Sequence, residues 1–498
     1  MFYVYNGVKG LININSKPNI VVIMCDQMRG DCLGIAGHPD VKTPSLDTLA
    51  SRGIRFENTY SACPSCIPAR AAFHTGLSQK HHGRVGYKDG VSWNYPCTLA
   101  GELSKNGYYT ECIGKMHVHP QRNLVGFHHI ELHNGVLEYY RKPNVDYSEH
   151  QSVADDYLYE MGKRGLPNAI LDSGIECNSW VARPWMYDEA DHPTNWVTTR
   201  SIDFLRRRDR SKPFFLMASY VRPHPPFDAP ACYFDMYRDM ELREPPVGDW
   251  ADEEGWKRCG RFYNSETGPL DKEFIRQAQI GYYACITHLD HQIGRLVQAL
   301  EEDDLYNNTL IIFTSDHGEL LCDHHTFRKS RPYQGSVNVP MIVCGPPHLV
   351  PKRGVASDTL IELCDVMPTL LQAAGAEVPE SLDGISFFGD FQGKTDGKHR
   401  DYIHGEHSGG GISTQYIITK TDKYIWYSQT GVEQYFDLEN DPTELHNAIS
   451  DAKYQDRIAK LRSLLIDELK DREEGYVQNG ELIVGQTPVA CLKHILEE

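Results

Sequence analysis

The sequence contains no apolar run long enough to cross a membrane. A spanning helix needs about 18 to 20 apolar residues in a row, and no stretch of the 498 residues reaches that length. Basic residues are also scarce, because 50 Lys and Arg stand against 68 Asp and Glu, for a formal net charge of −18. An acidic surface repels phosphate backbones, so we expect no nucleic-acid partner and no membrane partner.

The N-terminal residues lack the features of a secretory leader. Residues 1–17 show no basic start, no long apolar stretch and no small-residue cleavage site. The 14 cysteines are not arranged as in a short disulfide-rich scaffold, and several, such as Cys25 and Cys344, lie inside apolar runs. We therefore expect a reducing, cytoplasmic location, or a periplasmic one if a leader was removed.

Internal repeats and low-complexity segments are absent as well, whereas core-forming residues are plentiful. The chain has 28 Tyr, 17 Phe and 7 Trp, which excludes a disordered chain. Short apolar runs at 19–25, 108–114, 213–220 and 309–315 read as buried strands, and 98–106, 196–208 and 274–302 read as helices. Strands that alternate with helices predict an α/β fold with a large, mostly parallel sheet flanked by helices.

A polar, Gly-rich stretch at 388–400 marks the predicted domain boundary. We expect a catalytic α/β domain over residues 18–395. The remaining residues, 396–498, show short β-like runs at 416–421, 424–427 and 435–438 and a helical pattern at 454–472. This pattern predicts a smaller C-terminal α+β subdomain with an antiparallel sheet and a helix.

Two of the predicted strands end in residues that can bind metals. Asp26-Gln27 follows the first buried strand, and Asp316-His317 follows the strand at 309–315. Ligands of open α/β sheets bind at the carboxyl ends of the strands, so these four side chains are expected to meet. Oxygen donors with one imidazole suit a divalent cation such as Ca²⁺ or Mg²⁺, although each pair alone is equally consistent with an ordinary turn.

A third element is a short motif around a cysteine. Cys66-Ile67-Pro68-Ala69-Arg70 fits C-x-P-[SA]-R and is followed by Thr75-Gly76. This pattern resembles the signature of the sulfatases, in which the cysteine is oxidised after translation to formylglycine. Further segments resemble that family in the same order along the chain: Gly114–His117 (GKMH), Arg222–Pro226 (RPHPP), Lys329–Pro340 and Phe436–Glu444.

The resemblance implies an alkaline-phosphatase-like fold and hydrolysis of a sulfate monoester. It places the metal on Asp26, Gln27, Asp316 and His317 beside residue 66, with Ca²⁺ as the expected ion and Mg²⁺ or Mn²⁺ as alternatives. It also implies a formylglycine-generating enzyme as a maturation partner and a small-molecule or saccharide sulfate ester as substrate. The implied roles are Arg70 for orienting the nucleophile, Lys115 and Lys329 for gripping sulfate, His117 as base, and His224 as acid to the leaving oxygen.

The chemistry of sulfate esters accounts for these residue types. A sulfate monoester is an anion that becomes electrophilic only when its charge is neutralised, which a cation with Lys and Arg side chains can do. The hydrate of formylglycine offers one hydroxyl for attack on sulfur, and its second hydroxyl allows sulfate to leave.

Two features leave the reaction open to a second interpretation. Many sulfatases carry an Asp where this chain has Gln27, and often an Asn where it has His317. The combination resembles phosphonate monoester hydrolases, which are formylglycine relatives that cleave phosphonate monoesters and phosphodiesters. Asn338 also replaces a usual Arg.

Chemistry outside the hydrolases is less consistent with the sequence. Cys63 and Cys66 form a C-x-x-C pair that could exchange disulfides, but this leaves Arg70, Lys115 and Lys329 unexplained. A structural zinc site lacks a second C-x-x-C. A non-catalytic binding protein of the same fold would be expected to have lost Cys66 or the metal ligands.

Substrate selectivity is expected to reside in two loop-rich regions, 135–191 and 234–270. The Trp180–Trp185 segment fits either substrate binding or core packing. We expect none of the remaining histidines individually to line the pocket, and His81 and His82 are the better candidates among them. The sequence is silent on the alcohol half of the substrate and on the oligomeric state.

Overall fold

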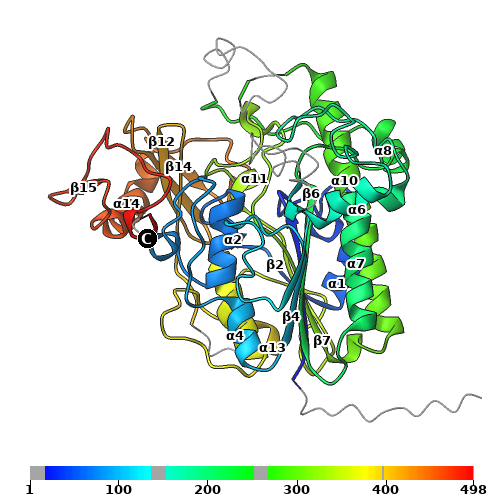
Figure 1. Ribbon diagram of the computed structural model, residues 1–498. Helices are drawn as coiled ribbons and strands as arrows, with labels where there is room; N and C mark the ends of the chain where they lie inside the picture. Colours follow the sequence, from blue (N-terminus) through cyan, green and yellow to red (C-terminus); the bar gives the residue numbers. More distant parts are fainter. Residues whose placement is uncertain (1–16, 136–152, 252–266, 269, 395–397, 497–498) are drawn as a thin grey trace, which may run out of the picture.

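An eight-stranded sheet forms the centre of the computed structural model, which describes residues 17–135, 153–251, 267–268, 270–394 and 398–496 (Figure 1). The strand order is β5-β4-β6-β1-β7-β8-β2-β9, and β8 alone runs antiparallel to its neighbours. The strands are β1 (Asn19–Asp26), β2 (Gly53–Phe56), β4 (Tyr109–Gly114), β5 (His129–Leu132), β6 (Phe214–Pro223), β7 (Thr309–Ser315), β8 (Met341–Cys344) and β9 (Val355–Ser357).

Helices cover both faces of this sheet, because its central strands are apolar on both sides. Alternate residues of β1 point to opposite faces: Val21 and Ile23 enter one core cluster, and Ile20, Val22 and Met24 enter the other. The first face packs against α1 (Pro44–Ser51), α7 (Pro193–Arg207) and α10 (Lys272–Glu302), and the second against α2 (Cys66–Thr75), α4 (Leu99–Lys105) and α12 (Val366–Ala373) (Figure 1).

Shorter elements complete this part of the chain. Strands β3 (Thr59–Tyr60) and β10 (Ile361–Glu362) pair in parallel. The remaining helices are α3 (Gln79–His82), α6 (Asp156–Lys163), α8 (Ala231–Arg238), α11 (Gln334–Val337) and α13 (Phe388–Gln392).

The C-terminal residues build a second, antiparallel sheet. Its order is β11 (Ile403–Gly409), β12 (Ile412–Ile418), β13 (Asp422–Tyr427) and β14 (Glu433–Asp437). One face packs on α14 (Gln455–Leu469), and the other packs on Tyr60, Leu320 and Tyr333 of the larger part. The small hairpin of β15 (Val477–Gln478) and β16 (Glu481–Leu482) follows. The second sheet is therefore attached to the larger part through an apolar core of its own.

The architecture confirms the predicted fold class of a large α/β sheet with a smaller C-terminal α+β part. The boundary between 395 and 396 stays a prediction, and the second sheet begins seven positions later, at Ile403. Within the described part of the chain, no helix combines the length and apolar character needed to span a bilayer.

Candidate active site

The predicted metal ligands lie together at the carboxyl end of the sheet. Asp26 ends β1, and Asp316 directly follows the neighbouring parallel strand β7, where its N–H donates to Cys25 O at 3.2 Å. The ligand atoms of Asp26, Cys66, Asp316 and His317 all lie within 4.8 Å of one another, and all four residues are buried. Strand pairing thus brings together side chains that are almost 300 positions apart in the sequence.

Cys66 lies at the centre of this group, at the start of α2. Its Sγ lies 3.6 Å from Asp26 Oδ2, 3.2 Å from His317 Nε2, 3.6 Å from Lys115 Nζ and 3.4 Å from Lys329 Nζ. Residue 66 therefore contacts one carboxylate, one imidazole and two ammonium groups.

Arg70 lies one helical turn after Cys66, on the same face of α2, as the i to i+4 spacing requires. Its Nε donates to Asp316 Oδ2 at 2.9 Å, and its Nη1 donates to Lys115 O at 2.7 Å and to Ser219 Oγ at 3.0 Å. The guanidinium thus joins α2 to the ends of β7, β4 and β6. Arg70 contacts the cluster without lining the cavity above Cys66.

Burial and the neighbouring charges have opposing effects on the pKa values of the cluster, and the net effect lowers the pKa of both Asp26 and Cys66. Burial raises the pKa of Asp26, but Lys115, His224 and Lys329 outweigh burial and hold that pKa well below its ordinary value. Burial and Asp26 also raise the pKa of the Cys66 thiol, and here Lys115 and Lys329 again prevail and lower it. The position of residue 66 therefore favours negative charge.

Both predicted sulfate-binding lysines reach the cluster. Lys115 directly follows β4 and forms an ion pair with Asp26. Lys329 Nζ donates to Gln27 Oε1 at 2.7 Å. Gln27 itself has a left-handed backbone, with φ of 70°, and its N–H donates to Asp316 Oδ1 at 3.2 Å. Such strain is typical of functional sites.

The two predicted catalytic histidines line the cavity above Cys66. His224 follows β6; its N–H donates to Asp26 O at 3.0 Å, and its Nδ1 lies 2.8 Å from Pro225 O. This bond to a carbonyl requires a proton on Nδ1, so Nε2 is the nitrogen available to a ligand. His117 also has a positive φ, 58°, and its ring lies 6.0 Å from the ring of Tyr87.

This cavity has a volume of about 530 Å³ and is formed by both parts of the chain. The larger part contributes Cys66, His117, His224 and Lys329, and the C-terminal sheet contributes the β11–β12 hairpin. The sequence analysis did not identify the other lining residues: Ser65, Tyr87, Cys177, Asn178, Arg328, Ser330, Arg331, His407, Gly409, Gly410, Ile412 and Thr414. Ser330 and Arg331 lie in the Lys329–Pro340 segment, but the residues of the C-terminal sheet are marked by no local motif, because they reach the cavity only through the packing of the two sheets.

Three residues that were weighed for this cavity lie outside it. His81 does not line it and instead pairs with Asp383, with Nδ1 2.7 Å from Oδ2. His82 is buried on α3, where its Nδ1 accepts from Arg84 N–H at 3.1 Å. Trp180 packs against Phe274 and Phe327 rather than lining the cavity.

Of the two loops assigned to selectivity, 135–191 contributes Cys177 and Asn178 to the cavity. Residues 136–152 of the first loop, and 252–266 and 269 of the second, lie outside the described residues.

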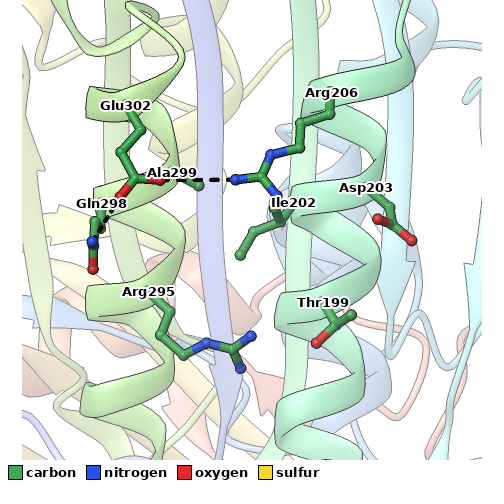
Figure 2. Close-up of a pocket in the computed structure, with 8 residues that line it drawn as sticks. All are labelled: Thr199, Ile202, Asp203, Arg206, Arg295, Gln298, Ala299 and Glu302. Carbon is green, nitrogen blue, oxygen red and sulfur yellow. Dashed lines mark hydrogen bonds and ion pairs between the residues drawn. The ribbon is translucent and has the colours of Figure 1, made fainter.

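A second hollow lies on the outer surface between α7 and α10 (Figure 2). It has a volume of about 280 Å³, and Arg206 faces Glu302 across it with their charged atoms 3.8 Å apart. None of the predicted site residues lines it. Of these two hollows, the one above Cys66 therefore holds the predicted site residues.

The C-x-x-C pair does not have the properties of a redox site. Cys63 and Cys66 are both buried and unbridged. Burial raises the pKa of Cys63 well above its ordinary value, whereas that of Cys66 is lowered by its neighbours. A dithiol motif needs an acidic first cysteine, and here the acidic one is the second.

Comparison with known proteins identifies the family of the chain. The family model described as Sulfatase matches residues 18–376, and one described as N-sulphoglucosamine sulphohydrolase, C-terminal, matches residues 322–471. The chain is 53% identical over 481 residues to an arylsulfatase of Clostridium perfringens (strain 13 / Type A), and the match covers 96% of this chain and 100% of the relative.

Solved structures share the fold. A phosphonate monoester hydrolase of Agrobacterium radiobacter is 25% identical, with a TM-score of 0.74 over 91% of this chain and 95% of that chain. A structure solved with its substrate D-glucosamine-2-N,6-O-disulfate is 22% identical, with a TM-score of 0.71 over 92% of this chain and 99% of that chain.

The chain belongs to the sulfatase family. It is an enzyme of the sulfuric ester hydrolase class, as the sequence analysis predicted.

Proposed function

We propose that this enzyme hydrolyses an aryl or carbohydrate sulfate monoester through a formylglycine derived from Cys66, with the help of one divalent metal. The observation that carries the proposal is the surroundings of Cys66 Sγ. Asp26, His317, Lys115 and Lys329 all lie within 3.7 Å of it. A nucleophile at this position has metal ligands on one side and sulfate-binding cations on the other.

The donor set fits a divalent cation. Two carboxylates, one imidazole and the side chain of residue 66 converge within 4.8 Å, and each is buried. His317 Nδ1 lies 3.0 Å from Gly318 O, which places the proton on Nδ1 and leaves the Nε2 lone pair toward Cys66. Asp26, Asp316 and His317 would hold the ion together with Gln27, and Ca²⁺ is the ion that we assign, with Mg²⁺ and Mn²⁺ as alternatives. A bound cation supplies Lewis-acid polarisation and a more acidic nucleophilic hydroxyl.

The lysines and Arg70 have separate tasks in this scheme. Lys115 and Lys329 flank residue 66 and neutralise the sulfate oxygens, which is the largest need of an anionic substrate. Arg70 touches Asp316 rather than the cavity, so it positions a metal ligand and balances its charge.

His224 is placed to handle the proton of the leaving oxygen. Burial and Lys329 lower its pKa well below the ordinary value, so the imidazole is neutral beside the unliganded lysine. A bound sulfate ester brings negative charge between them and opposes that effect, so that Nε2 can take up a proton and give it to the alcohol. His117, which also lines the cavity, is the base that we assign to the later release of sulfate.

The relatives support a sulfate ester as substrate. The 53% identical protein is named arylsulfatase, and one structural neighbour was solved with a disulfated glucosamine. Maturation by a formylglycine-generating enzyme is part of the same proposal.

Hydrolysis of phosphonate monoesters or phosphodiesters is a second candidate. Gln27 and His317 are the observations that favour it, and both lie at the cluster. Two phosphonate monoester hydrolases share the fold with TM-scores of 0.74.

Initial rates on 4-nitrophenyl sulfate and on 4-nitrophenyl phenylphosphonate distinguish the two candidates. The enzyme should be co-expressed with a formylglycine-generating enzyme, and the mass of the peptide around residue 66 should be measured. We expect faster turnover of the sulfate ester and none by Cys66→Ala. Preference for the phosphonate would replace the first candidate by the second.

A further inference from the structure

Glu319 is a buried carboxylate beside the cluster that the motifs do not identify. It is 3% exposed and lies two positions after His317. Its Oε2 accepts from Gln27 Nε2, and its Oε1 accepts from the backbone N–H of Leu321, at 2.8 Å, and of Arg328. All three partners are donors, which matches an acceptor-only carboxylate.

The position of Glu319 determines how the Gln27 amide is turned. Lys329 Nζ donates to Gln27 Oε1 at 2.7 Å, while Glu319 accepts from Gln27 Nε2. An ammonium can only donate and a carboxylate can only accept, so a single amide orientation satisfies both. In the flipped orientation, the amide NH₂ would face the ammonium and its oxygen would face the carboxylate.

Glu319 also supplies negative charge close to a ligand position that lacks it. Gln27 is neutral, and its amide is the link between the buried carboxylate and the cluster. Donation of the amide N–H to a carboxylate polarises the amide and makes its oxygen a better acceptor. The charge that an acidic residue at position 27 would carry is thus present one hydrogen bond further away.

The same carboxylate places Lys329. Its bond to Arg328 N–H closes the loop that begins at Glu319, and Leu320 N–H donates to Arg328 O at 2.8 Å within that loop. Lys329 is the next residue, and its ammonium lies 3.4 Å from Cys66 Sγ.

We propose that Glu319 is a positioning residue of this centre. It turns the Gln27 oxygen toward Lys329, whose ammonium contacts residue 66, and its charge compensates for the neutral side chain at position 27. This inference rests on the proposed function, because it assumes a cation bound by Asp26 and Asp316.

A double-mutant cycle on residues 27 and 319 tests the proposal. In Glu319→Gln, the amide oxygen of the new side chain still accepts from the N–H groups of Leu321 and Arg328. Its NH₂ group, however, faces the NH₂ group of Gln27, and both groups are donors. The Gln27 amide must then flip toward Lys329 or lose its partner. In Gln27→Glu with Glu319→Gln, the donor and the acceptor change places, and the total charge equals that of the wild type.

The measurement is the Kd for Ca²⁺ by isothermal titration calorimetry on purified full-length proteins, with thermal unfolding alongside. Loss of an outer partner of a metal ligand costs about 10- to 100-fold in affinity, and we expect such a loss in Glu319→Gln. We expect the double variant to bind within about threefold of the wild type, because the donor–acceptor pair between positions 27 and 319 is restored. Glu444→Gln is the matched control, because Glu444 is buried and paired with Lys423 of the C-terminal sheet; it should unfold earlier and keep its Kd.

The outcomes separate this proposal from the one on which it rests. Wild-type protein that binds no Ca²⁺, Mg²⁺ or Mn²⁺ would refute the metal centre and this inference together. If the wild type binds Ca²⁺ and Glu319→Gln binds equally well, the metal centre stands and Glu319 only supports the loop. An equal loss of affinity from Glu319→Gln in the wild type and in the Gln27→Glu variant would also overturn the inference, because it would show that the two side chains act independently.

Discussion

Arg70 and Asp316 form an ion pair in which Nε lies 2.9 Å from Oδ2 and both side chains are fully buried. The pair links the first helix of one face of the sheet to the end of a central strand. It also turns Asp316 so that its other oxygen, Oδ1, accepts from the N–H groups of Gln27 and His317. A single carboxylate thereby organises three residues of the site.

Arg70→Lys should destabilise the protein and abolish turnover. The single nitrogen of a lysine cannot bond Asp316, Lys115 O and Ser219 at once. Complete loss of a buried ion pair lowers the free energy of unfolding by about 3–5 kcal/mol, which is the upper limit of the expected cost. Urea unfolding measures the cost. Arg52→Lys is the control, because the Arg52–Glu301 pair is exposed on both sides and should change stability by less than about 1 kcal/mol. Equal effects of the two variants would contradict the role of Arg70.

Cys66→Ala should fold normally and lose all turnover, whereas Cys63→Ala should keep it. Both cysteines are buried, but only Cys66 contacts Lys115 and Lys329. Thermal unfolding checks the fold, and initial rates on 4-nitrophenyl sulfate check the activity. Full activity in Cys66→Ala would refute the formylglycine mechanism, and loss in Cys63→Ala alone would revive the thiol-redox hypothesis.

Removal of divalent metal by a chelator should stop turnover, and Ca²⁺ or Mg²⁺ should restore it. The ion should also raise the melting temperature, since a ligand at 100 times its Kd stabilises the folded state by about 2.7 kcal/mol. Asp316→Asn is the control and should show a much smaller shift. A wild-type enzyme indifferent to the chelator in both assays would exclude the metal assignment.

His224→Ala should be more harmful with poor leaving groups than with good ones. Loss of a general acid costs about 10²- to 10⁴-fold when the leaving oxygen needs a proton, and much less when it departs as a stable anion. Rates on phenyl sulfate and on 4-nitrophenyl sulfate measure the difference. An equal loss on both esters would show that His224 binds the substrate without donating a proton.

Glu362 should make the folded state less stable as the pH rises. Burial raises its pKa to about 7 from an ordinary value of 4.5, against the opposing effect of Arg400. The folded state therefore holds a proton that the unfolded state releases, and this stabilisation, up to about 3 kcal/mol, is lost between about pH 4.5 and pH 7.

Glu362→Gln should remove that part of the pH dependence. Unfolding free energies of the variant and the wild type, compared at pH 5 and pH 8, give the difference. Glu439→Gln, at an exposed position, serves as control and should follow the wild type. A pH dependence of Glu362→Gln identical to that of the wild type would contradict the raised pKa.

The sequence was sufficient for the parts of the site that lie at strand ends or inside a motif. Asp26 and Asp316 each follow a buried apolar run, and parallel pairing of adjacent strands makes their proximity predictable. The order of the strands was not predictable, and neither was the reversal of β8 between β7 and β2, because alternation of strands and helices does not specify the direction of each strand.

The residues that were missed depend on tertiary packing. Glu319 has no motif around it, and its importance follows only from its contact with Gln27. His407 enters the cavity because β11 packs beside the larger part, with Glu406 N–H donating to Ala62 O at 2.8 Å. His81 and His82 lie outside the cavity although they are near Cys66 in the sequence, because the chain turns after α2 at Gly76.

The hairpin at Gly409 and Gly410 forms one wall of the cavity while the nucleophile belongs to the larger part of the chain. The walls of the cavity are thus shared between the two parts of the chain, whereas the cluster around residue 66 belongs to one of them. Exchange of residues 407–414 among family members would then transfer preference for one alcohol over another and leave the bond-breaking apparatus intact. A few changes on this single β-turn and its flanks would therefore reshape one wall of the cavity without touching the residues around position 66.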